Sequence, residues 1–167
     1  HADVLVCSAN PFLELSGGVG GALLARYGHV VSEELEQLLE GRNEKWMPAG
    51  QIVITHPPRN PYLAVIHAVA VDGFYDSNID KVVETVRRAL SAAGAEGANS
   101  VALAALATGY GSLTLAEFGE AILRIKAEEH APLDRVTIVV PAMHRAEDLA
   151  NLLDVDNPRQ QRRHVIL

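Results

Sequence analysis

A glycine-rich stretch between an expected strand and an expected helix is the first part of this sequence whose residues could do chemistry. Residues 16–21 read Ser-Gly-Gly-Val-Gly-Gly, follow the apolar run 4–9 and lead into a helical pattern over 19–27. Unpaired N–H groups at a helix start carry partial positive charge, and glycine lets an anion approach the backbone closely. This arrangement can therefore hold a phosphate without a lysine. The alternative is a tight connecting loop that binds nothing, because such loops also occur without ligands.

A second glycine loop follows another expected strand. Residues 108–111 read Thr-Gly-Tyr-Gly and come after the apolar run 100–107, and Thr114 with Glu117 forms a capping-box signature for the next helix. In open α/β sheets, ligands bind beyond the carboxyl ends of the strands. Two glycine loops at that edge could hold a diphosphate from both sides.

Several residues near these loops admit both a structural and a functional interpretation. Asn10 precedes a proline, so it could cap a turn or hydrogen-bond a ligand. Cys7 could be a nucleophile, but no partner at a defined spacing supports that role, and we expect a buried thiol. His67 has apolar neighbours and is expected to be a core histidine. Asp72 and Asp76 could act on a ribose or form turns. The seven histidines show no metal-ligand spacing, so we expect no metal site.

Strands and helices alternate along the chain, with one hairpin inserted. Apolar runs predict strands over 4–9, 51–55, 63–71, 100–107 and 135–140, and a short edge strand or tail over 164–167. Helical periodicity predicts helices over 19–27, 32–41, 77–94, 114–125 and 146–153, with Ser32 and Ser77 as N-caps. This order predicts an α/β fold, a three-layer α/β/α sandwich with a mixed, mostly parallel central sheet. We expect one domain over residues 1–156 and a C-terminal tail or edge strand over 157–167.

The composition narrows the classes of partner. The 167 residues include 49% hydrophobic and 21% charged residues, as in ordinary globular domains, and the formal net charge is −7. Without a long basic run, the chain is not expected to bind nucleic acid. No apolar run reaches the length of a membrane span and no leader pattern is visible, so we expect a cytoplasmic protein with no membrane partner. A single cysteine, Cys7, excludes an internal disulfide, and homo-oligomerisation stays open.

With both loops in view, the sequence resembles the macro domain family, the ADP-ribose-binding module. The resemblance extends over roughly residues 2–153 and rests on five pieces in the family's order. Residues 6–10 and 16–22 resemble a strand end and the first phosphate loop, residues 48–55 and 65–69 resemble two further strands, and residues 104–111 resemble the second phosphate loop.

The resemblance implies the fold, an ADP-ribose pocket and the roles of its residues. Asn10 would hydrogen-bond the distal ribose, residues 17–21 would wrap the diphosphate and that ribose, and residues 108–112 would close over the phosphates with Tyr110 in the roof. No cofactor is implied, and Asn10 is also the candidate catalytic residue. The full ligand-binding set is Asn10, Ser16, Gly17, Gly18, Val19, Gly20, Gly21, Thr108, Gly109, Tyr110, Gly111 and Ser112.

Departures from the family pattern bear on the activity. Family members usually begin with a further strand, ending in Gly-Asp-Ile, whose Asp binds adenine; no such Asp can be assigned here, and residues 164–167 could replace that strand. Cys7 stands where many members have Asn, the second loop lacks the usual proline, and Gly20 stands where hydrolytic members often have a catalytic Asp. We expect binding of ADP-ribose or a derivative, with phosphatase-type or deacylase-type hydrolysis left open. The alternative is a macro-like interaction or assembly domain that binds no nucleotide.

Overall fold

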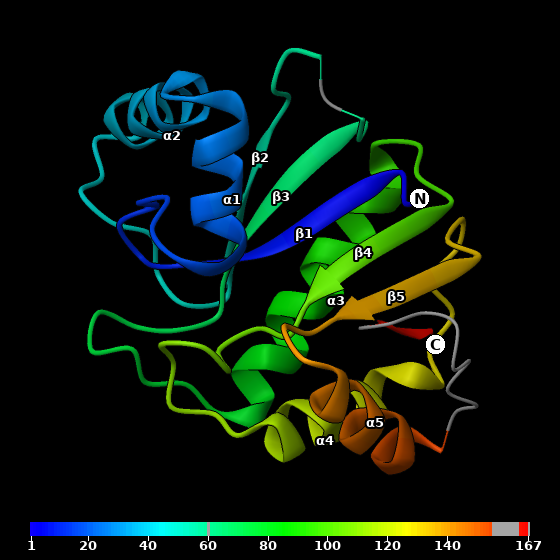
Figure 1. The fold of residues 1–167 in the computed structure, drawn as a ribbon. Helices are drawn as coiled ribbons and strands as arrows, with labels where there is room; N and C mark the ends of the chain where they lie inside the picture. Colours follow the sequence, from blue (N-terminus) through cyan, green and yellow to red (C-terminus); the bar gives the residue numbers. More distant parts are fainter. Residues whose placement is uncertain (60, 155–163, 167) are drawn as a thin grey trace.

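A mixed six-stranded sheet forms the centre of the computed structural model, which describes residues 1–59, 61–154 and 164–166, the last three by their backbone. The strands lie in the order β2-β3-β1-β4-β5-β6 (Figure 1). β1 is parallel to β3 and β4, and β4 is parallel to β5, whereas β2 and β6 are antiparallel to their neighbours β3 and β5. The strands are β1 (Val4–Ala9), β2 (Gln51–Thr55), β3 (Ala64–Val69), β4 (Ser100–Ala104), β5 (Arg135–Val139) and β6 (His164–Ile166).

Helices pack on both faces of this sheet. One hydrophobic core joins α3, α4 and α5 to alternate residues of the strands, such as Val6, Leu103 and Ile138. On the opposite face, Leu23 of α1 packs with Cys7, and residues of α2 pack with Val53 and Val69. The predicted three-layer α/β/α sandwich is therefore confirmed (Figure 1). The helices are α1 (Gly18–Tyr27), α2 (Val30–Gly41), α3 (Ile79–Ala95), α4 (Leu115–Lys126) and α5 (Met143–Leu153).

The central strand pair β1 and β4 carries both glycine loops at its carboxyl end. At the opposite end, the Asp3 carboxylate accepts hydrogen bonds from the Asn99 and Ser100 N–H groups and from the Ser100 hydroxyl. The hydroxyl and amide donors hold the pKa of Asp3 below its ordinary value, because they stabilise the ionised form. These bonds fix β1 beside β4, so the two loops that follow the strands lie next to each other.

Two predicted N-caps, Ser32 and Ser77, are wrong by three residues and one residue, for local reasons. The α2 helix begins at Val30 and contains Ser32, because the chain turns at Gly28 (φ 64°) and is already helical at His29. The N-cap of α3 is Asn78, whose side chain accepts from the Lys81 N–H, while the Ser77 hydroxyl donates to the Ala70 carbonyl oxygen instead. The predicted capping box of α4 is confirmed.

The remaining boundaries differ where strands approach the loops. β3 ends at Val69 and β4 at Ala104, two and three residues before the predicted ends, because the following residues turn into the loops. α5 begins three residues earlier than predicted, at Met143. The predicted hairpin of β2 and β3 is confirmed, and β6 pairs with β5 at the edge of the sheet. The expected tail over 157–163 lies outside the described residues.

Within the part of the chain that the structure describes, no helix is both long enough and apolar enough to cross a membrane.

Candidate ligand-binding cleft

The two glycine loops face each other across a cleft of about 860 Å³ at the carboxyl ends of β1, β4 and β5. This volume lies within the usual range for small-molecule sites. Ten of the twelve predicted ligand residues line it, namely Asn10, Ser16, Gly17, Gly18, Val19, Gly20, Thr108, Gly109, Tyr110 and Gly111. The other two do not. Gly21 N–H donates to the Gly17 carbonyl oxygen within the first turn of α1, and the Ser112 hydroxyl accepts from the Ser77 N–H.

The first loop presents the start of α1 to the cleft. Gly17 and Gly18 have φ values of 57° and 48°, a left-handed backbone that glycine adopts without strain. Gly17 is the N-cap, and neither a side-chain cap nor an acidic residue occupies the first turn of α1. The N–H groups of this turn therefore have no side-chain partner within the helix cap.

Tyr110 connects the second loop to the first. A Cβ placed on Gly17 would lie 2.8 Å from the Tyr110 hydroxyl oxygen and 2.9 Å from its ring, so the ring packs directly against the Gly17 backbone. The other side of the ring faces solvent, and the side chain is 77% exposed. Tyr110 thus forms a roof between the loops and leaves the cleft beneath it open.

The Asn10 side chain builds the first loop. Its Oδ1 accepts hydrogen bonds from the N–H groups of Phe12 (2.9 Å) and Glu14 (3.2 Å), and its Nδ2 donates to the Glu14 carbonyl oxygen (3.1 Å). The turn-forming interpretation of Asn10 is therefore what the geometry supports. Only the second hydrogen on Nδ2 remains for a ligand, so a ligand role of Asn10 stays a prediction. Oδ1 already accepts two hydrogen bonds and is not free to hold a water.

The loop after β3 also has a structural role. The Asp72 carboxylate accepts from the N–H groups of Phe74 and Asp76, which makes it a turn former, and neither Asp72 nor Asp76 lines the cleft. Tyr75 does line the cleft, and its carbonyl oxygen accepts from the Ser112 N–H of the second loop. Phe74 is 88% exposed and does not line the cleft.

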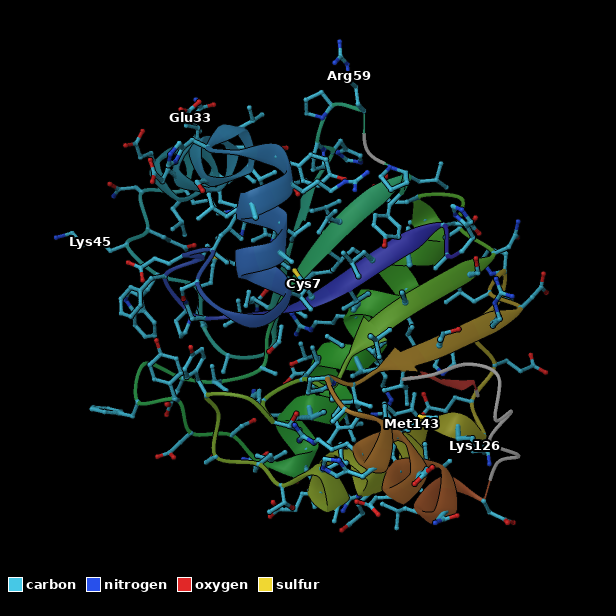
Figure 2. The ribbon with its side chains drawn as sticks, in the orientation of Figure 1. Cys7, Glu33, Lys45, Arg59, Lys126 and Met143 are labelled. Atoms are coloured by element: carbon cyan, nitrogen blue, oxygen red, sulfur yellow. The ribbon has the colours of Figure 1, made fainter. Side chains whose placement is uncertain are left out.

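Two residues that line the cleft, Cys7 and His67, belong to a buried group of three side chains that also includes Thr55. The Nδ1 atom of His67 lies 3.4 Å from Cys7 Sγ, and its Nε2 atom lies 2.9 Å from Thr55 Oγ1. A neutral imidazole donates from one nitrogen and accepts at the other, so both of its nitrogens are satisfied. Figure 2 shows Cys7 between α1 and the sheet. The core role predicted for His67 is confirmed, whereas its partner Thr55 could not be found from the sequence.

Burial keeps the side chains of Cys7 and His67 uncharged near neutral pH. Desolvation raises the pKa of the Cys7 thiol to about 12 and lowers the pKa of His67 to about 4, since both charged forms are disfavoured in the interior. The thiolate is the nucleophilic form of cysteine. Cys7 is therefore the structural thiol that the sequence predicts.

His67 makes the stability of the fold pH-dependent. Its folded pKa lies below the ordinary value of about 6.5, so the unfolded chain takes up a proton first as the pH falls. The stability that His67 contributes to the folded state is fully present above about pH 6.5 and is lost as the pH falls toward 4. We expect the free energy of unfolding to drop by about 2 kcal/mol from this group between pH 7.5 and pH 5.

Urea unfolding at the two pH values measures this drop. His67→Gln removes the titrating ring but keeps a polar group, so its own loss between pH 7.5 and pH 5 should be smaller by that amount. An equal loss in the wild-type protein and the variant would contradict the assignment. If the variant does not fold, an NMR titration of the His67 imidazole in the wild-type protein tests the lowered pKa directly. Titration of that ring near pH 6.5 would contradict the lowered pKa.

Charge is sparse in the cleft. Among the residues that the structure describes, the one carboxylate that lines the cleft is Glu14, and the cations are Arg26 of α1 and Arg145 of α5. Within the described residues, no group of three or more histidine, cysteine or acidic side chains could hold a metal ion. Binding of an anion here would depend mainly on backbone N–H groups.

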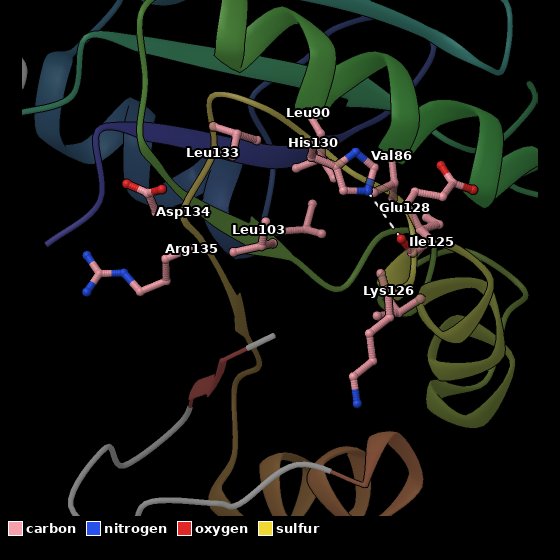
Figure 3. A pocket seen from close by; sticks show the side chains of 12 residues that line it. Val86, Leu90, Leu103, Ile125, Lys126, Glu128, His130, Leu133, Asp134 and Arg135 are labelled. Carbon is pink, nitrogen blue, oxygen red and sulfur yellow. Dashed lines mark hydrogen bonds between the residues drawn. The ribbon is translucent and has the colours of Figure 1, made fainter.

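A smaller pocket lies far from these loops, between α3, α4 and the start of β5 (Figure 3). Its volume is about 130 Å³, and its wall is mostly apolar, with Lys126 and Glu128 among its charged residues. His130 Nε2 donates to the Ile125 carbonyl oxygen beside it. This pocket is too small for a nucleotide.

The geometry defines a class of protein. It is an α/β module with a cleft between two loops at the carboxyl ends of its parallel strands. The Macro domain family model matches residues 6–122, and the chain therefore belongs to the macro domain family. This confirms the resemblance seen in the sequence.

Particular relatives agree with this assignment. The chain is 31% identical over 144 residues to an O-acetyl-ADP-ribose deacetylase of Klebsiella pneumoniae, covering 83% of this chain and 81% of the relative. The macrodomain of Oceanobacillus iheyensis with ADP superposes with a TM-score of 0.79 at 20% identity, covering 91% and 83% of the two chains. The macrodomain of Trypanosoma brucei in complex with ADP-ribose superposes with a TM-score of 0.67 at 22% identity, covering 92% and 62%.

Other relatives are longer. A protein of Pyrobaculum aerophilum is 37% identical over 109 residues, which cover 65% of this chain and 58% of that protein. The match to a Streptomyces nogalater macro domain-containing protein covers 61% of its length. The chain thus spans about three fifths of these relatives.

Proposed function

We propose that this chain binds ADP-ribose or a close derivative in the cleft between its two glycine loops. The observation that carries the proposal is the open cleft itself, with the uncapped start of α1 on one side and residues 107–111 on the other. The bound ADP and ADP-ribose of two structurally similar macrodomains support the same ligand class.

In the proposed complex, the diphosphate lies between the loops. The N–H groups at the start of α1 donate to it, and the helix dipole adds a favourable field. Tyr110 covers the phosphates, and the distal ribose lies on the Asn10 side. The apolar floor around Leu5, Leu23 and Val139 is suited to the less polar parts of the ligand.

The competing hypothesis is an assembly domain without a nucleotide site. It would be favoured by a cleft filled with Tyr110, Phe12 or the C-terminal tail. Of the residues that the structure describes, Tyr110 contacts Gly17 but leaves the cleft open, and Phe12 is not among the residues that line it. The tail over 157–163 lies outside the described residues. Ligand binding is therefore the better proposal.

Calorimetric titration with ADP-ribose, with AMP as the control, tests the proposal. We expect a dissociation constant in the micromolar range for ADP-ribose and much weaker AMP binding, because AMP lacks the second phosphate and the distal ribose. Absence of heat with millimolar ADP-ribose and folded protein would overturn the proposal and favour an assembly role.

A second candidate is hydrolysis of an acylated ADP-ribose, favoured by the relative named O-acetyl-ADP-ribose deacetylase. In such a reaction water adds to the ester carbonyl and the C–O bond breaks, leaving ADP-ribose and a carboxylate. Gly20 offers no carboxylate here, and Asn10 Oδ1 already accepts two N–H groups. Loop backbone groups would therefore have to hold the water.

Acetate release from O-acetyl-ADP-ribose measures this activity. Hydrolysis above the uncatalysed rate that disappears in the binding-deficient Gly18→Glu variant would support it. Equal release with and without the protein would restrict the function to binding.

A further inference from the structure

The β5 side of the cleft carries a cation that nothing in the described structure neutralises. Arg145 lines the cleft together with Val139, Val140 and Pro141, and its side chain is half-buried. It makes no hydrogen bond or ion pair with any residue for which the structure gives a position. The other arginine of the cleft, Arg26, donates from Nε to the Tyr27 hydroxyl.

Arg145 is also at an electrostatically unfavourable position in its helix. It is the third residue of α5, and the first turn of a helix favours anions and disfavours cations. No acidic residue occupies that turn to compensate. The fold alone therefore gives no reason for a cation here, whereas an anionic ligand in the cleft would supply its missing partner.

The sheet order places Arg145 relative to the proposed ligand. β4, which carries the second loop, lies between β1, which carries the first loop and Asn10, and β5, which leads to Arg145. Adjacent strands are about 4.8 Å apart, so β1 and β5 are about 10 Å apart. If the distal ribose lies on the Asn10 side, Arg145 lies on the adenosine side of the diphosphate.

Among the described residues, those that line this side include no acid, since Glu14, the one carboxylate among them that lines the cleft, belongs to the first loop. We propose that the cleft takes an ADP-ribose carrying a further phosphate on its adenosine ribose, and that Arg145 binds this phosphate. A guanidinium can donate two parallel hydrogen bonds to a phosphate, which makes such a contact both strong and specific. This inference rests on the proposed function and names its substrate class.

The test compares the affinities of ADP-ribose and ADP-ribose 2′-phosphate for the wild-type chain, Arg145→Gln and Arg26→Gln. The wild type should prefer the 2′-phosphate about tenfold, as expected for one charge-assisted contact. Arg145→Gln should lose that preference and bind the two ligands with equal affinity. Arg26→Gln removes the same charge from the α1 side of the cleft and should keep the preference.

Equal affinity of the wild type for the two ligands would overturn the inference and leave the proposed function intact. Equal weakening of both ligands in Arg145→Gln would overturn it as well, because Arg145 would then contact the diphosphate. Failure of the wild type to bind ADP-ribose at all would remove the proposed function itself.

Discussion

Replacing Gly18 with glutamate is expected to weaken ADP-ribose binding by at least about 100-fold, or about 3 kcal/mol. A Cβ at Gly18 meets no atom within 4 Å, so the new side chain displaces nothing and extends into open space beside the first loop. Its carboxylate would stand at the start of α1, where the diphosphate is proposed to dock. Repulsion and loss of space act together there. Calorimetric titration of the variant measures the effect.

Gly28 supplies the matched control. It also has a positive φ and an open Cβ position, but it lies at the far end of α1 and does not line the cleft. Both glutamate variants place a side chain at a positive φ, and Gly28, with φ 64° and ψ −149°, lies in a region that is essentially restricted to glycine, so Gly28→Glu should lose at least as much stability as Gly18→Glu. The folded Gly28→Glu variant should nevertheless bind ADP-ribose like the wild type. Wild-type affinity in a folded Gly18→Glu variant would rule out the proposed position of the diphosphate.

Alanine at Gly111 should disrupt the second loop. A Cβ there would collide with the Ala107 carbonyl oxygen and lie 2.9 Å from both its C and its Cα atoms, which are backbone atoms that cannot rotate away. The same Ala107 oxygen accepts from the Leu113 N–H, so the whole turn has to open. We expect a loss of about 1–3 kcal/mol of stability and at least a tenfold loss of ADP-ribose affinity.

Gly109 is the control in the same loop, because a Cβ at Gly109 meets nothing within 4 Å and its φ is not positive. Gly109→Ala should keep the melting temperature of the wild type, because its new methyl group meets no protein atom. Thermal melting and titration of the two variants provide the comparison. Similar behaviour of Gly109→Ala and Gly111→Ala would show that the close contact at Ala107 does not hold the loop.

The parts of the site that follow from local sequence could be predicted. Residues 16–21 and 108–111 each follow a strand and precede a helix, and that local order is enough to bring them to one edge of a parallel sheet. The capping box at Thr114 and Glu117 is equally local, since its partners are three residues apart. Ser32 and Ser77 show the limit of predicting N-caps from local sequence, because both helices begin at other residues next to neighbouring turns.

Contacts between distant residues could not be predicted. Thr55 meets His67 only because β2 and β3 pair in a particular register, and no local pattern gives that register. Arg145 reaches the cleft because β5 is the next strand beyond β4, and its position in the sequence carries no sign of this. Asn10 was correctly placed beside the cleft, but its hydrogen bonds to the first loop depend on the detailed course of residues 10–14.

The most direct test of the account is an NMR titration of the ¹⁵N-labelled chain with ADP-ribose. We expect the largest amide shifts in residues 17–21 and 107–111, because their N–H groups or their immediate neighbours contact the diphosphate in the proposed complex. The amides around the smaller pocket, such as those of Lys126, Glu128 and His130, should stay unchanged. Shifts confined to residues outside the two loops, or none at saturating ADP-ribose, would contradict the central claim that the glycine loops hold the ligand.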